Sequence, residues 1–185
     1  MRIAFVGRMG SGKTTAATEA AKLYDGKVVK IAEPLYNAAI AVYAILGMNW
    51  EKDGRLLQFL GTEWGRNIHE DFWVDKFRVK WLSSTEHLFC DDLRFPNEEY
   101  ILRELMGFKI IRIDRGYHTF TDEQLDTIAL GRDPTHPSEM QMDSLRHDLI
   151  VRNDRSESEF KMEVVRAIEY LYPGRTSIIH GEDAQ

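Results

Sequence analysis

A chain of 185 residues, 43% of them hydrophobic and 11% aromatic, has the size and composition of one globular domain. Its 24 basic and 30 acidic residues leave a formal charge of −6, which argues against a protein that holds nucleic acid by neutralising phosphates. The single cysteine, Cys90, excludes an internal disulfide bond, and the six histidines show no metal-binding spacing. No apolar run approaches the ~18 residues of a membrane-spanning helix, and the N-terminus resembles a strand rather than a signal peptide. We therefore expect a cytoplasmic protein without membrane or nucleic-acid partners.

Strand and helix patterns alternate along the chain. Short apolar runs predict strands at residues 2–6, 27–31, 87–90, 108–113 and 148–151, with a buried thiol at Cys90. Helical periodicity predicts helices at residues 13–24, 34–46, 96–106 and 158–171, and two more between 53 and 83. Residues 114–146 are rich in turn-forming residues and are expected to be mobile, with one short helix at 122–130. The alternation predicts a single α/β domain over residues 1–185, with a five-stranded parallel sheet, helices on both faces and ligands at the carboxyl ends of the strands.

A glycine-rich segment follows the first predicted strand. Residues 7–14 (GRMGSGKT) fit the phosphate-binding pattern G-x-x-x-x-G-K-[ST] without a mismatch. Backbone N–H groups of such a P-loop bind phosphate oxygens, and the N-terminus of the following helix adds positive potential. We expect ATP to bind here, with Lys13 on the β- and γ-phosphates and the Thr14 hydroxyl on Mg²⁺. The predicted ATP-binding residues of this segment are Gly10, Ser11, Gly12, Lys13, Thr14 and Thr15.

A P-loop indicates a nucleotide-binding protein but not its reaction. A regulatory GTPase would need an N-K-x-D motif, which the sequence lacks. An ATP-driven motor would normally be larger, although Asp91 and Asp92 at the end of an apolar run resemble its acidic pair. Arginines near the predicted strand ends suit a small-molecule kinase better, because such an enzyme must neutralise two phosphate groups brought together.

Five further blocks of sequence resemble the phage deoxynucleoside monophosphate kinases. In chain order they are residues 31–35, residues 55–62, Trp73, the D-x-R-x-x-x-E block at 92–98 and the H-x-S-E block at 136–139. The family's P-loops carry basic residues where this chain has Met9 and Gly10, and the helical insertions of larger members are absent. The resemblance implies a three-layer P-loop kinase fold with a short lid at 114–146 and Mg²⁺ as cofactor. It also implies transfer of the γ-phosphoryl group of ATP to a deoxynucleoside 5′-monophosphate, in the host cytoplasm if the gene is carried by a phage.

The acceptor site that the resemblance implies draws on several predicted elements. Arg55, Gly61 and Thr62 would lie along the monophosphate, and Arg94 would contact it. Its predicted members are Glu33, Leu35, Tyr36, Arg55, Gly61, Thr62, Arg66, Trp73, Asp92, Arg94 and Glu98. Leu35, Tyr36 and Trp73 would line the sugar and base, Asp92 would hold Mg²⁺ or a sugar hydroxyl, and Glu98 would accept a hydrogen bond from the base or sugar.

Some of these residues also suit a purely structural role. Trp73 lies at helical spacing from apolar neighbours, so it could belong either to the core or to the wall of the pocket. Trp64 is predicted to lie in the core. Arg66 follows the Gly61-Thr62 block, which favours phosphate, but Glu63 or Glu70 is an alternative partner on a helix surface. Glu33 would equally suit a helix N-terminus.

Arginines around the irregular segment are the candidate catalytic cations. In kinases of this architecture such a segment closes over ATP and stabilises charge on the transferred group. Arg132 is preferred and Arg115 comes second, and together with Lys13 and Asp92 they form the predicted catalytic set. Asn153, after the fifth predicted strand, is expected beside the adenine of ATP, and His136 has no assigned role.

Two other functions remain open at this point. One is a kinase of a modified base within DNA, which the charge of −6 disfavours. The other is a nucleotide-binding protein without catalytic activity. The sequence is compatible with a homodimer and does not specify which bases are accepted.

Overall fold

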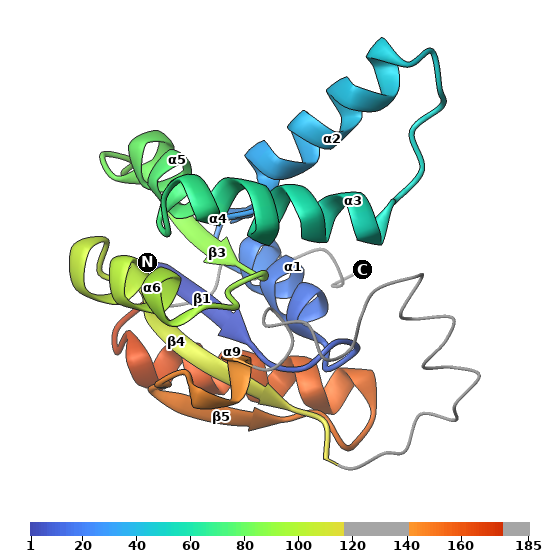
Figure 1. The fold of residues 1–185 in the computed structure, drawn as a ribbon. Helices are drawn as coiled ribbons and strands as arrows, with labels where there is room; N and C mark the ends of the chain where they lie inside the picture. The colour runs from blue at the N-terminus through green and yellow to red at the C-terminus, as the bar shows by residue number, and fades with distance from the viewer. Residues whose placement is uncertain (117–140, 176–185) are drawn as a thin grey trace.

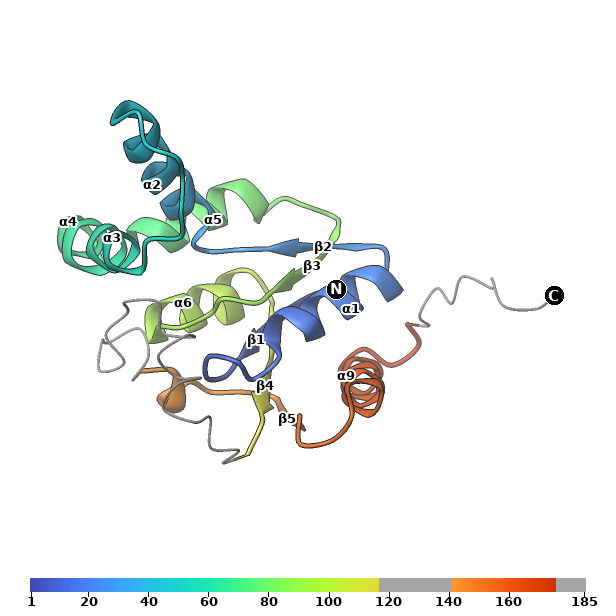
Figure 2. The same cartoon turned by 90° about the vertical axis from the view of Figure 1, so that its right-hand side faces the viewer.

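A parallel sheet forms the centre of the protein, whose computed structural model describes residues 1–116 and 141–175. The strands are β1 (Arg2–Val6), β2 (Gly26–Val29), β3 (His87–Cys90), β4 (Lys109–Asp114) and β5 (Leu149–Arg152). They lie in the order β2-β3-β1-β4-β5, and every pair is parallel. Figure 1 labels β3, β1, β4 and β5 in this order, and Figure 2 also labels β2 next to β3. The predicted five-stranded parallel sheet is confirmed, with each strand ending within two residues of its expected limits.

Helices cover both faces of this sheet. They are α1 (Lys13–Leu23), α2 (Glu33–Ile45), α3 (Gly54–Gln58), α4 (Gly65–Ile68), α5 (Phe72–Trp81), α6 (Pro96–Tyr100) and α9 (Glu157–Leu171). Two π-helical turns, η1 (Phe59–Trp64) and η2 (Ile101–Leu105), and a 3₁₀ turn, η3 (Gln141–Ser144), complete the described elements. Figure 2 shows α2 to α5 beside β2 and β3, and α9 beside β5. None of the helices in the described ranges is long and apolar enough to cross a membrane.

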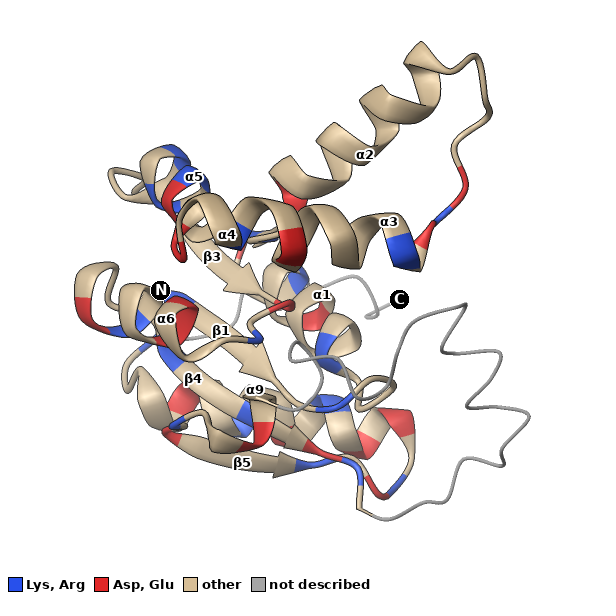
Figure 3. Ribbon diagram, in the orientation of Figure 1, with Lys and Arg blue, Asp and Glu red and all other residues tan. Residues whose placement is uncertain are grey.

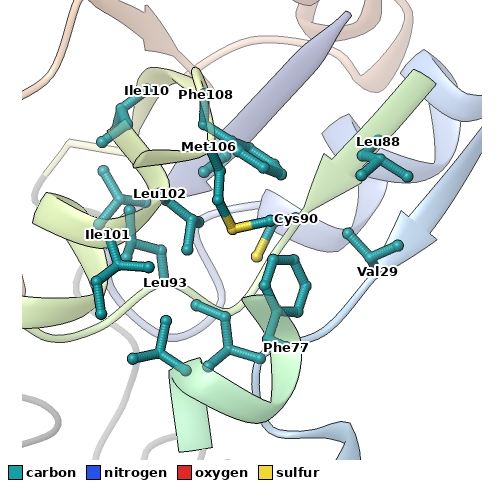
Figure 4. Packing of buried hydrophobic residues seen from close by; sticks show 14 of the residues in the cluster. Val29, Phe77, Leu88, Cys90, Leu93, Ile101, Leu102, Met106, Phe108 and Ile110 are labelled. Atoms are coloured by element: carbon teal, nitrogen blue, oxygen red, sulfur yellow. The ribbon is translucent and has the colours of Figure 1, made fainter. Parts of the chain in front are cut away.

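The alternation of side chains along β1 divides the core between the two faces. Ile3 and Phe5 pack with the alanines of α1 and with α9 on one face. Ala4 and Val6 pack on the other face, against α5 and η2. This second cluster surrounds Cys90, which is fully buried as predicted (Figure 4). Burial raises the pKa of the Cys90 thiol well above its usual range, so the thiol stays protonated and acts as a small apolar side chain.

The region between residues 53 and 83 departs from the two helices predicted for it. It forms α3, η1, α4 and α5, with η1 inserted between the two short helices. The wider π-helical turn shifts the side chains that follow it around the helix axis. Trp64, predicted to lie in the core, is instead 46% exposed and packs edge-on against Phe72, with ring centroids 5.8 Å apart. The prediction for Trp64 was wrong because a uniform helical period was assumed.

Asp148, just before β5, is hydrogen-bonded to β4 and to Arg103. Its Oδ2 accepts a hydrogen bond from the backbone N–H of Ile110 at 2.7 Å, and both of its carboxylate oxygens accept from Arg103, at 2.9 and 3.0 Å. Burial alone would raise the pKa of Asp148, but these hydrogen bonds outweigh it and lower the pKa.

Replacing Asp148 by Asn tests this link. We expect the free energy of unfolding at pH 7 to fall by about 1–3 kcal/mol, because a charge-assisted acceptor is lost. Since the folded-state pKa is lowered, the stabilisation is present above the usual carboxyl pKa of ~3.9 and is lost as the pH falls through the folded value. Denaturant unfolding of both proteins across pH measures this; a difference that persists unchanged at the acid end contradicts it. Glu163→Gln, in an exposed ion pair on α9, is the control with less than about 1 kcal/mol of effect.

Candidate active site

The P-loop connects β1 to α1 at the carboxyl edge of the sheet. Gly12 has φ 105°, and a Cβ there would lie 2.5 Å from Nδ2 of Asn153, so only glycine suits the position. The Asn153 amide donates a hydrogen bond to the carbonyl of Ser11 at 2.8 Å, which ties the loop to the end of β5. Lys13 Nζ donates to the carbonyls of Gly7 and Arg8, both at 2.7 Å. These hydrogen bonds hold the curled shape of the loop, with the Lys13 ammonium on the loop's own backbone carbonyls.

Two adjoining cavities lie beside this loop. The smaller, of about 230 Å³, is lined by P-loop residues together with Asp91. The larger, of about 430 Å³, lies against α2, η1 and α5. Both are lined by Lys30, Tyr36, Lys52, Asp92 and Arg94, so they form two halves of one cleft. Figure 3 shows basic and acidic residues close together in the chain segments at the carboxyl ends of the strands.

The larger cavity brings together ten of the eleven predicted acceptor residues. They are Glu33, Leu35, Tyr36, Gly61, Thr62, Arg66, Trp73, Asp92, Arg94 and Glu98. The exception is Arg55, which is exposed on α3 and lines neither cavity. Arg55 directly follows Gly54, the first residue of α3, and this places it outside the cleft.

Trp73 is both a core residue and a wall of the larger cavity. Its side chain is 4% exposed, and its Nε1–H donates a hydrogen bond to the carbonyl of Gly61 at 3.0 Å. A Cβ on Gly65 would lie 2.5 Å from this Nε1, so glycine lets the indole lie directly against the backbone. Trp73 is therefore a core residue that also lines the cavity, and the hydrogen bond fixes the plane of its ring.

Arg66 and Glu98 form a buried ion pair at the floor of the larger cavity. The Arg66 guanidinium pairs with Glu98 Oε1 and lies 3.7 Å from the ring centroid of Phe95. Glu98 Oε2 accepts hydrogen bonds from the backbone N–H groups of Arg94 and Phe95, at 2.9 and 3.1 Å. Burial raises the pKa of Glu98, and the charge of Arg66 opposes this shift. The side chains of Glu63 and Glu70 do not pair with Arg66, because Glu98 of α6 is its partner. The backbone carbonyl of Glu70 accepts a second hydrogen bond from Arg66.

The adjacent carboxylates Asp91 and Asp92 have different partners. Asp92 accepts hydrogen bonds from the backbone N–H groups of Ile31 and Ala32, both at 2.9 Å, and so positions the start of α2. Asp91 is 3% exposed and accepts from the Thr14 hydroxyl at 2.7 Å. The expected metal ligand was Asp92, whereas Asp91 is the carboxylate that lies on the P-loop. Side chains alternate at the end of β3, and this decides which of the two faces Thr14.

Lys30 is a site residue that sequence reasoning missed. Its Nζ lies 2.6 and 2.8 Å from the two carboxylate oxygens of Asp91. Burial lowers the pKa of Lys30, but the hydrogen bond and charge of Asp91 outweigh it and raise the pKa overall. The strand predicted at residues 27–31 included Lys30, so the residue was not expected in the cleft. Because β2 ends at Val29, Lys30 lies just beyond the strand, at the carboxyl edge of the sheet.

Thr14 and Asp91 suit a magnesium ion. Both offer hard oxygen atoms, and Mg²⁺ in nucleotide sites is commonly held by one or two carboxylates with phosphate oxygens and water. Within residues 1–116 and 141–175 no group of three His, Cys, Asp or Glu side chains is placed to hold a metal. Thr14 and Asp91 alone would leave most positions of such an ion to phosphate oxygens and water.

Arg115 and Asp143 contact the P-loop from the C-terminal half of the chain. Arg115 donates a hydrogen bond to the carbonyl of Gly10 at 2.8 Å. Asp143, in η3, pairs with Arg8 of the loop at 2.8 Å and with Arg112 at 2.7 Å, and hydrogen bonds from both arginines lower its pKa. Arg146 pairs with Glu99. The predicted catalytic Arg132, His136 and the predicted helix at 122–130 lie outside the described residues.

Replacing Asp92 by Asn separates its structural role from metal binding. The amide keeps one acceptor oxygen but turns an NH₂ group toward a backbone N–H, so we expect the ligand-free protein to lose about 1–3 kcal/mol of unfolding free energy. Thermal or denaturant unfolding measures it, with Glu104→Gln on η2, an exposed carboxyl, as the control that stays within about 0.5 kcal/mol of wild type. Wild-type stability in Asp92→Asn would show that its contacts to Ile31 and Ala32 do not hold the cleft together.

The chain matches no family model and no curated protein. It resembles solved structures at low sequence identity. Shikimate kinase from Aquifex aeolicus has a TM-score of 0.53 at 12% identity, over 94% of this chain and 99% of that chain. Shikimate kinase from Acinetobacter baumannii, in complex with shikimate, has a TM-score of 0.51 at 11% identity, over 92% of each chain. These similarities show that the chain has the three-layer α/β fold of P-loop kinases.

Proposed function

We propose that the protein is a kinase that transfers the γ-phosphoryl group of ATP to a deoxynucleoside 5′-monophosphate. The observation that carries the proposal is the two-part cleft, in which a P-loop opens onto a cavity of about 430 Å³ with an aromatic wall. The cations Lys30, Lys52 and Arg94 lie at the junction, where the phosphates of donor and acceptor would meet. The choice of a deoxynucleotide rests on the resemblance of the five sequence blocks.

ATP would bind with its phosphates on the P-loop. Lys13 would exchange the carbonyls of Gly7 and Arg8 for the β- and γ-phosphate oxygens, since an anion is a stronger partner for an ammonium than a carbonyl. Asn153 would hold the loop in shape through the Ser11 carbonyl. Thr14 and Asp91 would hold Mg²⁺, which when bound neutralises phosphate charge.

The acceptor would lie in the larger cavity. Trp73 and Leu35 offer flat and apolar walls to a base, while Thr62 and Tyr36 offer hydroxyl groups to its edge or to the sugar. Arg94 lines both halves of the cleft and would hold the acceptor phosphate in line with the γ-phosphate. The attacking phosphate oxygen is anionic near neutral pH, so the reaction needs no general base.

An ADP-release assay tests the proposed function. Purified protein with ATP and Mg²⁺ is offered each deoxynucleoside and ribonucleoside monophosphate, with shikimate and gluconate as acceptors of a different class. We expect acceptor-dependent ADP release with at least one deoxynucleoside monophosphate. Release only with shikimate or gluconate, or none with any acceptor, would overturn the proposal.

Lys13→Ala is expected to reduce turnover by at least ~10²-fold, because a preorganised charge on the transferred phosphoryl group is lost. The fold should persist, since the loop is held by Gly12 and Asn153 rather than by this side chain. Steady-state kinetics and thermal unfolding check the two statements. The matched control is Lys22→Ala on the exposed end of α1, which should keep wild-type turnover. Normal turnover in Lys13→Ala would exclude the residue from the mechanism.

Arg94→Lys is expected to raise the KM for the monophosphate about tenfold or more while the KM for ATP changes little. A lysine keeps the charge but loses the planar fork that suits a phosphate. Arg166→Lys, on the exposed surface of α9, is the control for the substitution type. If Arg94 only braces the loop after β3, both KM values and the melting temperature should worsen together.

A further inference from the structure

Lys30 occupies the junction between the two halves of the cleft. It directly follows β2 and lines both cavities. Its side chain is 46% exposed, whereas the carboxylate of Asp91 beneath it is fully buried. The ammonium contacts both oxygens of that carboxylate, and the Thr14 hydroxyl contacts one of them. The ion pair therefore covers the same oxygens that Mg²⁺ would need.

A magnesium ion at Asp91 would compete with the Lys30 ammonium for the same carboxylate oxygens. The ammonium lies within hydrogen-bond distance of both oxygens, whereas Mg²⁺ takes a ligand oxygen at about 2.0–2.1 Å in near-octahedral geometry. Two cations on one carboxylate repel each other in a partly buried site, so binding of the metal weakens the contact between Asp91 and the ammonium. The flexible four-carbon stem of a half-exposed lysine allows the ammonium to move away.

The surroundings leave the displaced ammonium few anionic partners. The other carboxylates lining the larger cavity have partners of their own in the described structure. Glu33 pairs with Lys80, Glu98 pairs with Arg66, and Asp92 accepts from backbone N–H groups. The anions that a nucleotide complex would add at the junction are phosphates.

We propose that Lys30 exchanges partners during the reaction cycle: it neutralises Asp91 in the ligand-free protein, yields Asp91 to Mg²⁺ when the nucleotide binds, and then contacts the phosphoryl oxygens between donor and acceptor. The inference rests on the proposed function for its last step. Its first step concerns metal and nucleotide alone. The Lys30 ammonium thus becomes available to the phosphates only when the metal has taken its place on Asp91.

This exchange predicts effects of opposite sign in one variant. In Lys30→Met the competing cation is gone, so Mn²⁺, used as a spectroscopic substitute for Mg²⁺, should bind the ADP-loaded protein roughly tenfold more tightly. The turnover number should fall by about 10²-fold, because a charge on the transferred group is lost. A lysine that only supported the fold would weaken both properties when it is removed.

Electron paramagnetic resonance measures free Mn²⁺ during titration of the ADP-loaded protein, and the ADP-release assay at saturating Mg²⁺ measures turnover. Lys27→Met is the matched control, since Lys27 lies on β2, the strand that precedes Lys30, in an exposed ion pair with Glu86, and it should leave both values unchanged. Circular dichroism establishes that each variant is folded. Lys30→Arg should restore weak Mn²⁺ binding, because a guanidinium also pairs with a carboxylate.

The Mn²⁺ titration and the turnover assay test different steps of the proposal. Unchanged or weaker Mn²⁺ binding in folded Lys30→Met overturns the exchange, whatever the protein's activity. Tighter Mn²⁺ binding with unchanged turnover overturns the contact with the transferred group. If the wild-type protein phosphorylates no acceptor, the proposed function fails, while the Mn²⁺ titration still decides whether Lys30 competes with the metal for Asp91.

Discussion

The hydrogen bond between the Thr14 hydroxyl and the buried Asp91 carboxylate joins the two parts of the protein on which the cleft depends. Thr14 belongs to the first turn of α1, and Asp91 follows β3 directly. Because β3 pairs with both β1 and β2, this one carboxylate lies next to the P-loop and next to the residue that follows β2. A buried charge is stable only with partners, and Asp91 has them in Thr14 and Lys30. The P-loop, the start of α1 and Lys30 thus meet at a single buried carboxylate.

The other buried carboxylates of the cleft also have hydrogen-bond partners. Asp92 is satisfied by the start of α2, and Glu98 by the start of α6 and by Arg66. Asp92 and Glu98 each fix one segment of the wall by accepting hydrogen bonds from its backbone N–H groups. Removing such an acceptor leaves unsatisfied donors, so the shape of the larger cavity is set by electrostatics as much as by apolar packing.

Much of this arrangement could be predicted from the sequence because it depends on local pattern. The P-loop motif and the apolar runs placed the sheet, and parallel topology then required the strand-end residues to converge. The resemblance to the phage kinases, rather than this local pattern, supplied the acceptor residues, ten of which line one cavity. What could not be predicted depends on side-chain direction and small shifts in element ends. Trp64 is exposed because η1 interrupts the helical period. Lys30 lies at the carboxyl edge because β2 ends at Val29, and side-chain alternation after β3 turns Asp91 rather than Asp92 toward Thr14. No sequence pattern encodes the partner of Arg66, since Glu98 lies 32 residues away.

The fixed indole of Trp73 also gives the protein an optical reporter of the larger cavity. Its ring is buried, its N–H is engaged by Gly61, and the cavity lies against it, so a base that stacks there would change its emission without moving it. The chain contains four tryptophans, and the other three lie at positions 50, 64 and 81. A protein in which those three are phenylalanine would emit from a single site, and occupancy of the cavity could be read as fluorescence, one nucleotide at a time, before any phosphoryl group is transferred.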